Sequence, residues 1–149
     1  MILSGQSIRR RGIFTPFSER TKEHGMTYGI GPAGYDVRVR EALELPPGGF
    51  SLASTVEHFA MPNDVLGTVH DKSTWARLGL AAQTTVIEPG WRGWLTLELT
   101  NHGRETLRIK AGSPIAQIIL HLLDEPTEAA YGGKYQDQAA GAQAAILEK

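Results

Sequence analysis

The sequence contains no cysteine among its 149 residues. Disulfide bonds, thiolate zinc sites and cysteine nucleophiles are therefore excluded. Neither sign of charge is in excess, because 15 Lys and Arg stand against 16 Asp and Glu and give a formal net charge of -1. This balance argues against a general nucleic-acid-binding protein or a membrane-surface helix, and it leaves room only for a local basic pocket.

Long hydrophobic runs are also missing. The longest apolar stretch is far too short to span a bilayer, and the N-terminus lacks the apolar core of a signal peptide. Hydrophobic residues make up 41% of the chain and charged residues 21%, which is the balance of a folded globular protein. We therefore expect a single cytoplasmic domain over residues 1–149, with no nucleic-acid or membrane partner.

Seventeen glycines and eight prolines divide the chain into short segments, and this spacing favours many strands over a few long helices. Residues 3–12 predict one short helix, with Ser4 as a candidate cap and Gly12 at its end. Residues 13–33 mix glycine, proline and charged residues, and we interpret them as a loop.

Strands are predicted where apolar and polar residues alternate or where a short apolar run is bounded by turn residues. The clearest is 94–100, in which three leucines point to one side and Trp, Thr and Glu to the other. The tail from Glu125 onward lacks such a pattern, so its order would require contacts from elsewhere, such as another subunit. The pattern as a whole predicts an all-β sandwich or barrel with one short N-terminal helix. The expected strands cover 35–40, 50–54, 65–69, 94–100, 107–109 and 115–123.

Glu98 is the first candidate for chemistry. It lies mid-strand between leucines, on a face that also carries Trp94 and threonines. A carboxylate in such a place is partly desolvated unless it is paired, which raises its pKa toward values useful for proton transfer. The same pattern is equally consistent with an ordinary solvated face.

The segment from Lys72 to Arg77 places two cations and two hydroxyls within six residues. It could begin a helix capped by Ser73 or Thr74, with free backbone N–H groups directed at an anion. Lys72 would add a point charge and Arg77 a planar fork for oxygen ligands. An ordinary capped turn with surface charges is the simpler interpretation.

Two further segments carry candidate binding groups. Glu88 precedes a Pro-Gly turn at the mouth of the hairpin, where it could grip a hydroxyl or only satisfy the turn's own N–H groups. In the tail, Tyr131 could stack on a base, Lys134 could meet a phosphate and Gln138 could bond a base edge, or the whole stretch could be a flexible terminus.

The five histidines have no tight metal-ligand spacing, and no His-x-Glu pairs with a downstream Cys-x-x-Cys. A zinc-dependent deaminase is thus excluded, and no metal-binding residue is predicted. No nucleophile elbow or Walker loop is present either.

Taken together and in this order, the segments resemble the dCTP deaminase branch of the dUTPase-like superfamily over roughly residues 30–140. Each piece is weak alone, whereas the combination is specific. The resemblance rests on PAGYDVRV at 32–39, DKSTWARLGL at 71–80, IEPGWRGWLTLELTNHG at 87–103, GSPIAQI at 112–118 and KYQDQ at 134–138.

The resemblance implies a distorted β-barrel with jelly-roll character, assembled as a homotrimer with active sites at subunit interfaces. It implies the zinc-independent hydrolytic deamination of dCTP, or of a related deoxycytidine nucleotide, to the deoxyuridine nucleotide and ammonia. Mg²⁺ would be bound by the triphosphate rather than by a set of protein ligands. The tail over 125–149 is expected to close over the site.

The same resemblance carries roles onto single residues. The catalytic glutamate falls on Glu98, and the groups that position the water fall on Ser73 and Arg77. The substrate contacts fall on Lys72, Ser73, Thr74 and Arg77 for phosphate, on Glu88 for the sugar, on the backbone at Thr96 and Leu97 for the base, and on Tyr131, Lys134 and Gln138 in the tail.

Three departures from the family pattern keep other activities open. Glu88 stands where the family has Asp, Lys72 stands where it has Arg, and the stretch between Leu80 and Ile87 is short. A dUTPase, or a bifunctional deaminase and diphosphatase, would use Glu88 to activate water at the α-phosphate. A third alternative is a nucleotide-binding homologue without catalysis.

Overall fold

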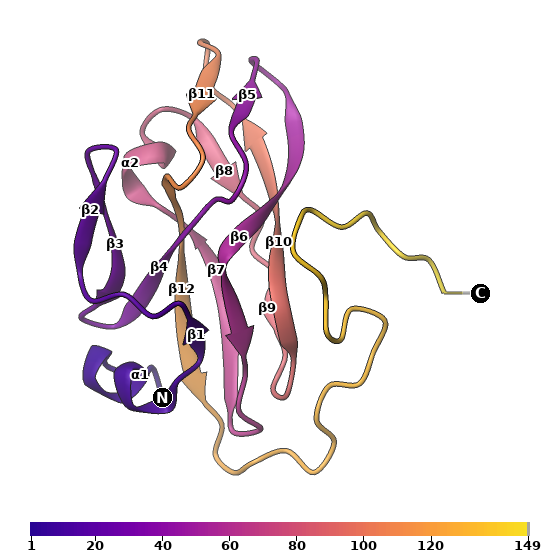
Figure 1. The fold of residues 1–149 in the computed structure, drawn as a ribbon. Helices are drawn as coiled ribbons and strands as arrows, with labels where there is room; N and C mark the ends of the chain where they lie inside the picture. The colour runs from indigo at the N-terminus through magenta and orange to yellow at the C-terminus, as the bar shows by residue number, and fades with distance from the viewer. Residues whose placement is uncertain (149) are drawn as a thin grey trace.

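The structure is a computed structural model that describes residues 1–148, and it confirms a mostly β fold with one short N-terminal helix (Figure 1). None of the helices within these residues is long and apolar enough to cross a membrane. The elements in chain order are α1 (Gly5–Arg11), β1 (Phe14–Thr15), β2 (Thr21–Glu23), β3 (Met26–Gly31), β4 (Gly34–Arg38), β5 (Leu43–Leu45), β6 (Phe50–Ala60), β7 (Val65–Asp71), α2 (Ser73–Ala76), β8 (Leu80–Ala82), β9 (Val86–Ile87), β10 (Arg92–Asn101), β11 (Leu107–Ile109) and β12 (Pro114–Leu122).

Two larger sheets enclose the core. One has the order β1-β6-β10-β8 and the other the order β2-β3-β4-β12-β7-β9, while β11 and β5 form a short pair of their own at one end (Figure 1). The side chains between the sheets form a single apolar cluster, in which Tyr35, Phe59 and Leu99 are fully buried.

Helix α1 ends where the sequence predicts, because Gly12 takes a left-handed conformation with φ of 62°. Three arginines in its last turn lie near the negative end of the helix dipole. Ser4 occupies the N-cap position, as predicted, although its side chain makes no capping hydrogen bond. Ile8 attaches the helix to the core.

The interpretation of residues 13–33 as a loop is wrong, since they form β1, β2 and β3. β2 and β3 are joined by a tight turn at His24 and Gly25, both with positive φ. All three residues of β2 are exposed, so the strand carries no alternation of apolar and polar residues that could predict it.

β10 is the strand that positions the site. Its leucines at 95, 97 and 99 are buried, whereas Thr96 and Glu98 on the other face are half-buried. The strand pairs with β6 along most of its length, and the register shifts between Trp94 and Thr96. At that irregularity the Thr55 hydroxyl accepts a hydrogen bond from the Leu95 N–H (3.0 Å), which satisfies the backbone group that the bulge leaves unpaired.

The tail lies against its own chain, and the contacts from elsewhere that the sequence called for come here from β10 of the same chain. Residues 125–148 form no helix or strand, yet Gln138 makes an isolated parallel bridge with Gly93 at the start of β10. Figure 1 shows the tail leaving β12, turning beneath the body and rising beside β10. The tail is therefore placed over the outer face of β10, the face that carries Glu98.

Candidate active site

A cavity of about 590 Å³ lies between β10, β6, the segment around β9 and the tail. It brings together residues that are far apart in the sequence, including both candidate acids. Five of the predicted site residues contribute to its lining: Glu88, Thr96, Glu98, Tyr131 and Gln138.

Glu98 is the unusual group in this cavity. Its side chain is half-buried, and its Oε2 atom is buried without a hydrogen-bond partner among residues 1–148. Burial raises the pKa of the Glu98 carboxyl, because desolvation disfavours the charged form. Buried carboxylate oxygens normally have partners, so this one points to a ligand or water that completes the site. Of the two interpretations of the strand pattern, the desolvated face is the one observed.

The Thr96 hydroxyl, next to Glu98 on the same face of β10, is held by the tail. Its Oγ1 accepts hydrogen bonds from Gln138 Nε2 (2.9 Å) and from the backbone N–H of Gln143 (3.1 Å). Gln138 Nε2 also donates to the carbonyl of Trp94 (2.7 Å). These contacts close one side of the cavity with residues of the tail.

Glu88 lies on the turn before β10 and is exposed. Its carbonyl accepts a hydrogen bond from the Trp91 N–H (3.1 Å), which closes the Pro-Gly turn, while the Trp91 ring is buried beneath it. The Glu88 side chain also lines a second cavity of about 370 Å³, which shares Tyr131 with the first. Glu88 therefore lines both cavities.

Apolar residues also line the larger cavity. Phe50 and Val86 line it although they are 57% and 53% exposed, and so do Leu95 and Leu52, the cross-strand partner of Glu98. Exposed apolar side chains at a cavity mouth commonly mark a surface that a ligand or another chain covers.

Helix α2 places its polar residues outside this cavity. Ser73, Thr74 and Arg77 are exposed, and none of them contributes to the cavity lining. The helix is anchored by the buried Trp75, whose Nε1 donates to the carbonyl of Pro114 (2.8 Å). In Figure 1, α2 lies on the side of the body opposite the tail.

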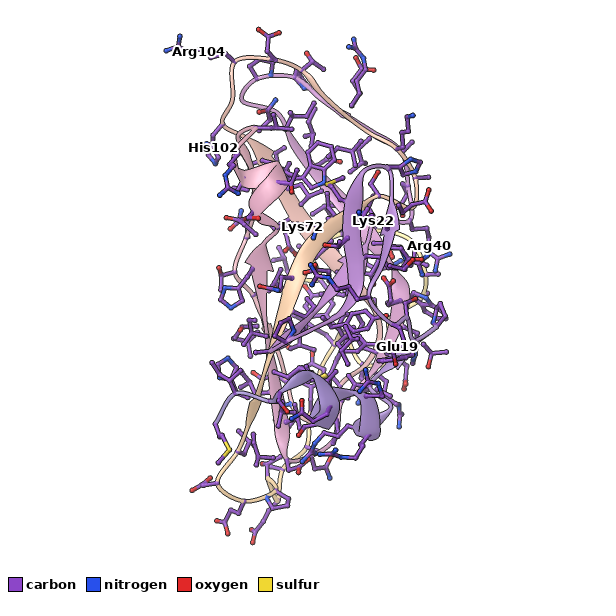
Figure 2. All side chains as sticks on the ribbon, turned by 90° about the vertical axis from the view of Figure 1, so that its left-hand side faces the viewer. Glu19, Lys22, Arg40, Lys72, His102 and Arg104 are labelled. Carbon is purple, nitrogen blue, oxygen red and sulfur yellow. The ribbon has the colours of Figure 1, made fainter. Side chains whose placement is uncertain are left out.

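Lys72 forms an ion pair with a carboxylate. Its Nζ lies 2.8 Å from Asp36 Oδ2, and the two side chains are only 9% and 16% exposed. Figure 2 shows Lys72 within the body of the molecule, whereas His102 and Arg104 project at its upper end. Lys72 is also the residue at the N-terminal boundary of α2, and it makes no side-chain capping bond, so the predicted cap by Ser73 or Thr74 is wrong.

Two other predicted contacts lie outside the cavity lining. The Leu97 side chain points into the core and is 1% exposed. Lys134 is exposed in the tail, and its ammonium lies 5.4 Å from the centre of the Tyr135 ring.

Several residues that the sequence did not single out do line the cavity, notably Trp91, Tyr135 and Gln143. Trp91 Nε1 donates to the carbonyl of Tyr135 (2.6 Å), which ties the turn at Glu88 to the tail. Trp91 and Tyr135 could have been found from the sequence, because each lies inside a motif that carries the family resemblance. Gln143 could not, because it stands in an alanine-rich stretch. Within residues 1–148, no three His, Asp or Glu side chains gather closely enough to hold a metal ion.

The chain is similar to known proteins over most of its length. The family described as dCTP deaminase-like matches residues 35–123. The chain is 34% identical to a dCTP deaminase of Gemmatimonas aurantiaca, with 87% of this chain and 89% of the relative covered. It is 36% identical to a dCTP deaminase of Campylobacter fetus, with 89% of each covered, and 35% identical to one of Thermococcus sibiricus, with 91% and 92% covered.

Solved structures with a similar fold are dUTPases. The EIAV dUTPase superposes with a TM-score of 0.61 at 22% identity, covering 82% of this chain and 97% of that one. The dUTPase of Staphylococcus bacteriophage 80alpha gives a TM-score of 0.58 at 18% identity, covering 80% and 92%. These likenesses confirm the predicted dUTPase-like fold, and the sequence match is more specific: the chain belongs to the dCTP deaminase-like family.

Proposed function

We propose that this protein catalyses the hydrolytic deamination of dCTP to dUTP and ammonia, with Glu98 as the group that moves protons. Two findings support the proposal: the chain's membership of the dCTP deaminase-like family, and the buried, unpartnered Oε2 of Glu98 in a cavity. The second observation carries the mechanism, because a carboxylate whose pKa is raised by desolvation can both accept and donate a proton near neutral pH.

The reaction needs two proton transfers that one carboxylate can perform. Glu98 takes a proton from the water that attacks C4 of cytosine and delivers it to the ring nitrogen N3, which gives a tetrahedral intermediate. The hydroxyl proton then passes through Glu98 to the amino group, the C4–N bond breaks and ammonia leaves. Each positioned proton transfer contributes about 10²–10⁴ in rate.

Ser73 and Arg77 complete the site from a neighbouring copy of the chain, in a homotrimer. This part of the proposal rests on the family resemblance, and it is supported by the exposure of Ser73 and Arg77 outside the cavity of their own chain. There they orient the attacking water, and the positive charge of Arg77 favours the ionised form of Glu98 when a base is required. The exposed Phe50 and Val86 at the cavity mouth would be covered by the same neighbour.

The nucleotide is held by polar groups from both chains. On the chain that carries Glu98, Glu88 binds the sugar hydroxyl, and the backbone at Thr96 and Leu97 reads the base edge. Tail residues cover the ligand, and Mg²⁺ arrives on the triphosphate without a protein ligand of its own. Lys72 reaches a phosphate only if it leaves Asp36. The proposed phosphate contacts are Lys72, Ser73, Thr74 and Arg77, and the proposed tail contacts are Tyr131, Lys134 and Gln138.

A second activity is favoured by one observation, namely that Glu88 lines the same cavity as Glu98. A carboxylate at that position could activate water at the α-phosphate, which would release pyrophosphate and leave dUMP. Deamination and pyrophosphate release would then follow one another in one site.

The products of a single incubation separate these activities. The protein is incubated with Mg²⁺ and either dCTP, dCMP or dUTP, and ammonia and pyrophosphate are measured independently. Ammonia from dCTP without pyrophosphate is the expected result. Ammonia together with pyrophosphate would establish the bifunctional enzyme, pyrophosphate from dUTP alone would replace the proposal by a dUTPase, and binding without either product would leave a non-catalytic nucleotide-binding protein.

A further inference from the structure

We propose that Gln136 is a positioning residue: its side-chain amide clamps the tail to the turn at residues 88–92 and so holds Tyr131 and Gln138 at the cavity of Glu98. The inference rests on the proposed function, because the tail is given the task of holding the nucleotide there. Gln136 itself makes no contact with the cavity.

Every hydrogen-bonding position of this amide is used by a backbone group. Nε2 donates to the carbonyls of Gly90 and Tyr131, each at 2.9 Å. Oε1 accepts from the N–H of Arg92 (2.8 Å) and of Asp137 (3.2 Å). An amide has two donor and two acceptor positions, so the side chain is saturated. Two partners belong to the turn and two to the tail, and one half-buried side chain therefore joins the two segments.

The residues on either side of Gln136 are the ones that reach the cavity. Tyr131 donates its N–H to the carbonyl of Pro89 (2.9 Å), and its hydroxyl accepts from the N–H of Tyr135 (3.2 Å). Beyond the clamp, the Gln138 amide bonds Trp94 and Thr96. A change at Gln136 would thus act on the ligand site through Tyr131, Tyr135 and Gln138.

Other contacts between the tail and the turn are weaker candidates for this role. The ion pair between Arg92 and Asp137 is 56% and 64% exposed, and pairs of that kind contribute little. The Trp91 indole adds one bond to the Tyr135 carbonyl. Gln136 supplies two bonds to the turn and two more within the tail, and it is the only one of these side chains that bonds both segments through both ends of one group.

The test uses Gln136→Glu in the full chain. This variant keeps the shape and the acceptors of the side chain but loses both donors, and it places a negative charge against the carbonyls of Gly90 and Tyr131. Gln6→Glu is the matched control, since it makes the same chemical change at an exposed position of α1. Release of the tail is measured without nucleotide as the rate of trypsin cleavage after the exposed Lys134, and the catalytic effect as KM and kcat for dCTP.

We expect Gln136→Glu to raise the cleavage rate and the KM for dCTP each by about tenfold or more, with a much smaller change in kcat and no change in Gln6→Glu. A wild-type cleavage rate in Gln136→Glu would show that the clamp does not hold the tail. Faster cleavage with an unchanged KM would show that it holds the tail without positioning it for the ligand. Either result overturns the inference, whereas a wild-type protein that does not deaminate dCTP overturns the proposed function and leaves the cleavage measurement valid.

Discussion

Glu98 combines two properties that one residue rarely has, a place on a central strand and a carboxylate oxygen without a partner. It stands on a central strand whose other face is core, yet its carboxylate has an oxygen without a partner in a cavity. Desolvation raises the pKa of this carboxyl, so the group costs the fold some stability whenever it is ionised. Groups whose burial lowers the stability of the fold in this way are common at functional sites.

The pH dependence of the reaction should report this group. Glu98 must be ionised to accept a proton from water, so kcat/KM for dCTP should fall about tenfold per pH unit once the pH drops below its raised pKa. The lower limb should therefore begin above pH 4.5, the ordinary glutamate value from which the pKa of Glu98 is raised. A profile that stays flat down to pH 4.5 would contradict the assignment.

Thermal unfolding gives an independent readout of the same pKa. A glutamate whose pKa is raised in the folded state favours folding when protonated and opposes it when ionised. Glu98→Gln should consequently have a higher Tm than the wild type at pH 8, and the difference should shrink as the pH falls through the raised pKa toward 4.5. If the wild type and Glu98→Gln had the same Tm as each other both at pH 8 and at pH 4.5, Glu98 would not be desolvated.

At the scale of elements, α2 is held by an ion pair with a neighbouring strand in addition to the buried Trp75. The Lys72–Asp36 pair is almost fully buried and lies directly before the first residue of the helix. Its loss would disturb the placement of Ser73 and Arg77 even if Lys72 never touched a ligand.

Lys72→Met should lower the free energy of unfolding by about 3 kcal/mol, because the Asp36 carboxylate is left buried without its partner. Adding Asp36→Asn should recover part of this loss, since no unpaired charge remains. Arg108→Met is the control: its pair with Glu44 is 76% and 62% exposed, so its removal should cost less than about 0.5 kcal/mol. Urea unfolding of the four proteins measures these values, and equal losses for Lys72→Met and Arg108→Met would contradict the account.

The tail approaches the start of β10 closely at Gly93, where a larger residue would be in its way. Gly93 has a φ of 144°, and a Cβ built on it would lie 2.7 Å from the backbone nitrogen of Gln138. Gly93→Ala should therefore push the tail from the strand and raise the KM for dCTP by about tenfold. Gly112→Ala is the control for backbone strain alone, because Gly112 also has a positive φ (80°) but no atom within 4 Å of the added methyl. Equal KM values for the two variants would show that tail contact at Gly93 is not needed.

Elements whose burial is carried by apolar side chains could be predicted from the sequence. β10 shows strict alternation and was predicted within two residues at its start. β6 was predicted only to residue 54, although it continues to Ala60, because the alternation is interrupted by the buried polar residues Thr55 and Glu57. Their burial depends on partners elsewhere in the chain, Leu95 for Thr55 and Arg38 for Glu57, which a local pattern does not contain.

Only part of the candidate site could be predicted, again because contacts with residues distant in the sequence leave no local pattern. The two acids stand in recognisable motifs, and the cavity brings both to one place. The environment of Lys72 was not predictable, because Asp36 is distant in the sequence. The tail contacts of Gln136 were not predictable either, since three of the four partners lie outside its immediate chain neighbours and all are backbone groups.

At the scale of the whole molecule, the proposed trimer makes the site a joint product of two chains. Glu98 would come from one chain and Ser73 and Arg77 from the next. Size-exclusion chromatography with light scattering should then give three times the 16.2 kDa of one chain, and a monomer mass would contradict the assembly.

Mixing two inactive variants tests the sharing of sites. Glu98→Gln and Arg77→Ala should each lose activity alone. After unfolding and refolding at equal amounts, about one third of the sites in mixed trimers, and about a quarter of all sites in the mixture, would combine an intact Glu98 with an intact Arg77 from the neighbour. The mixture should regain roughly that share of wild-type ammonia release. No recovery, with mixed trimers demonstrated by a size tag, would show that each chain builds its site alone.

The role of Glu98 in deamination has the most direct test in ammonia release by Glu98→Gln. The substitution removes the proton carrier and retains the size and polarity of the side chain, so turnover of dCTP should fall by about 10³-fold or more. Binding of dCTP, measured by calorimetry, should stay within a few-fold of the wild type. A Glu98→Gln variant that releases ammonia at the wild-type rate would contradict the account.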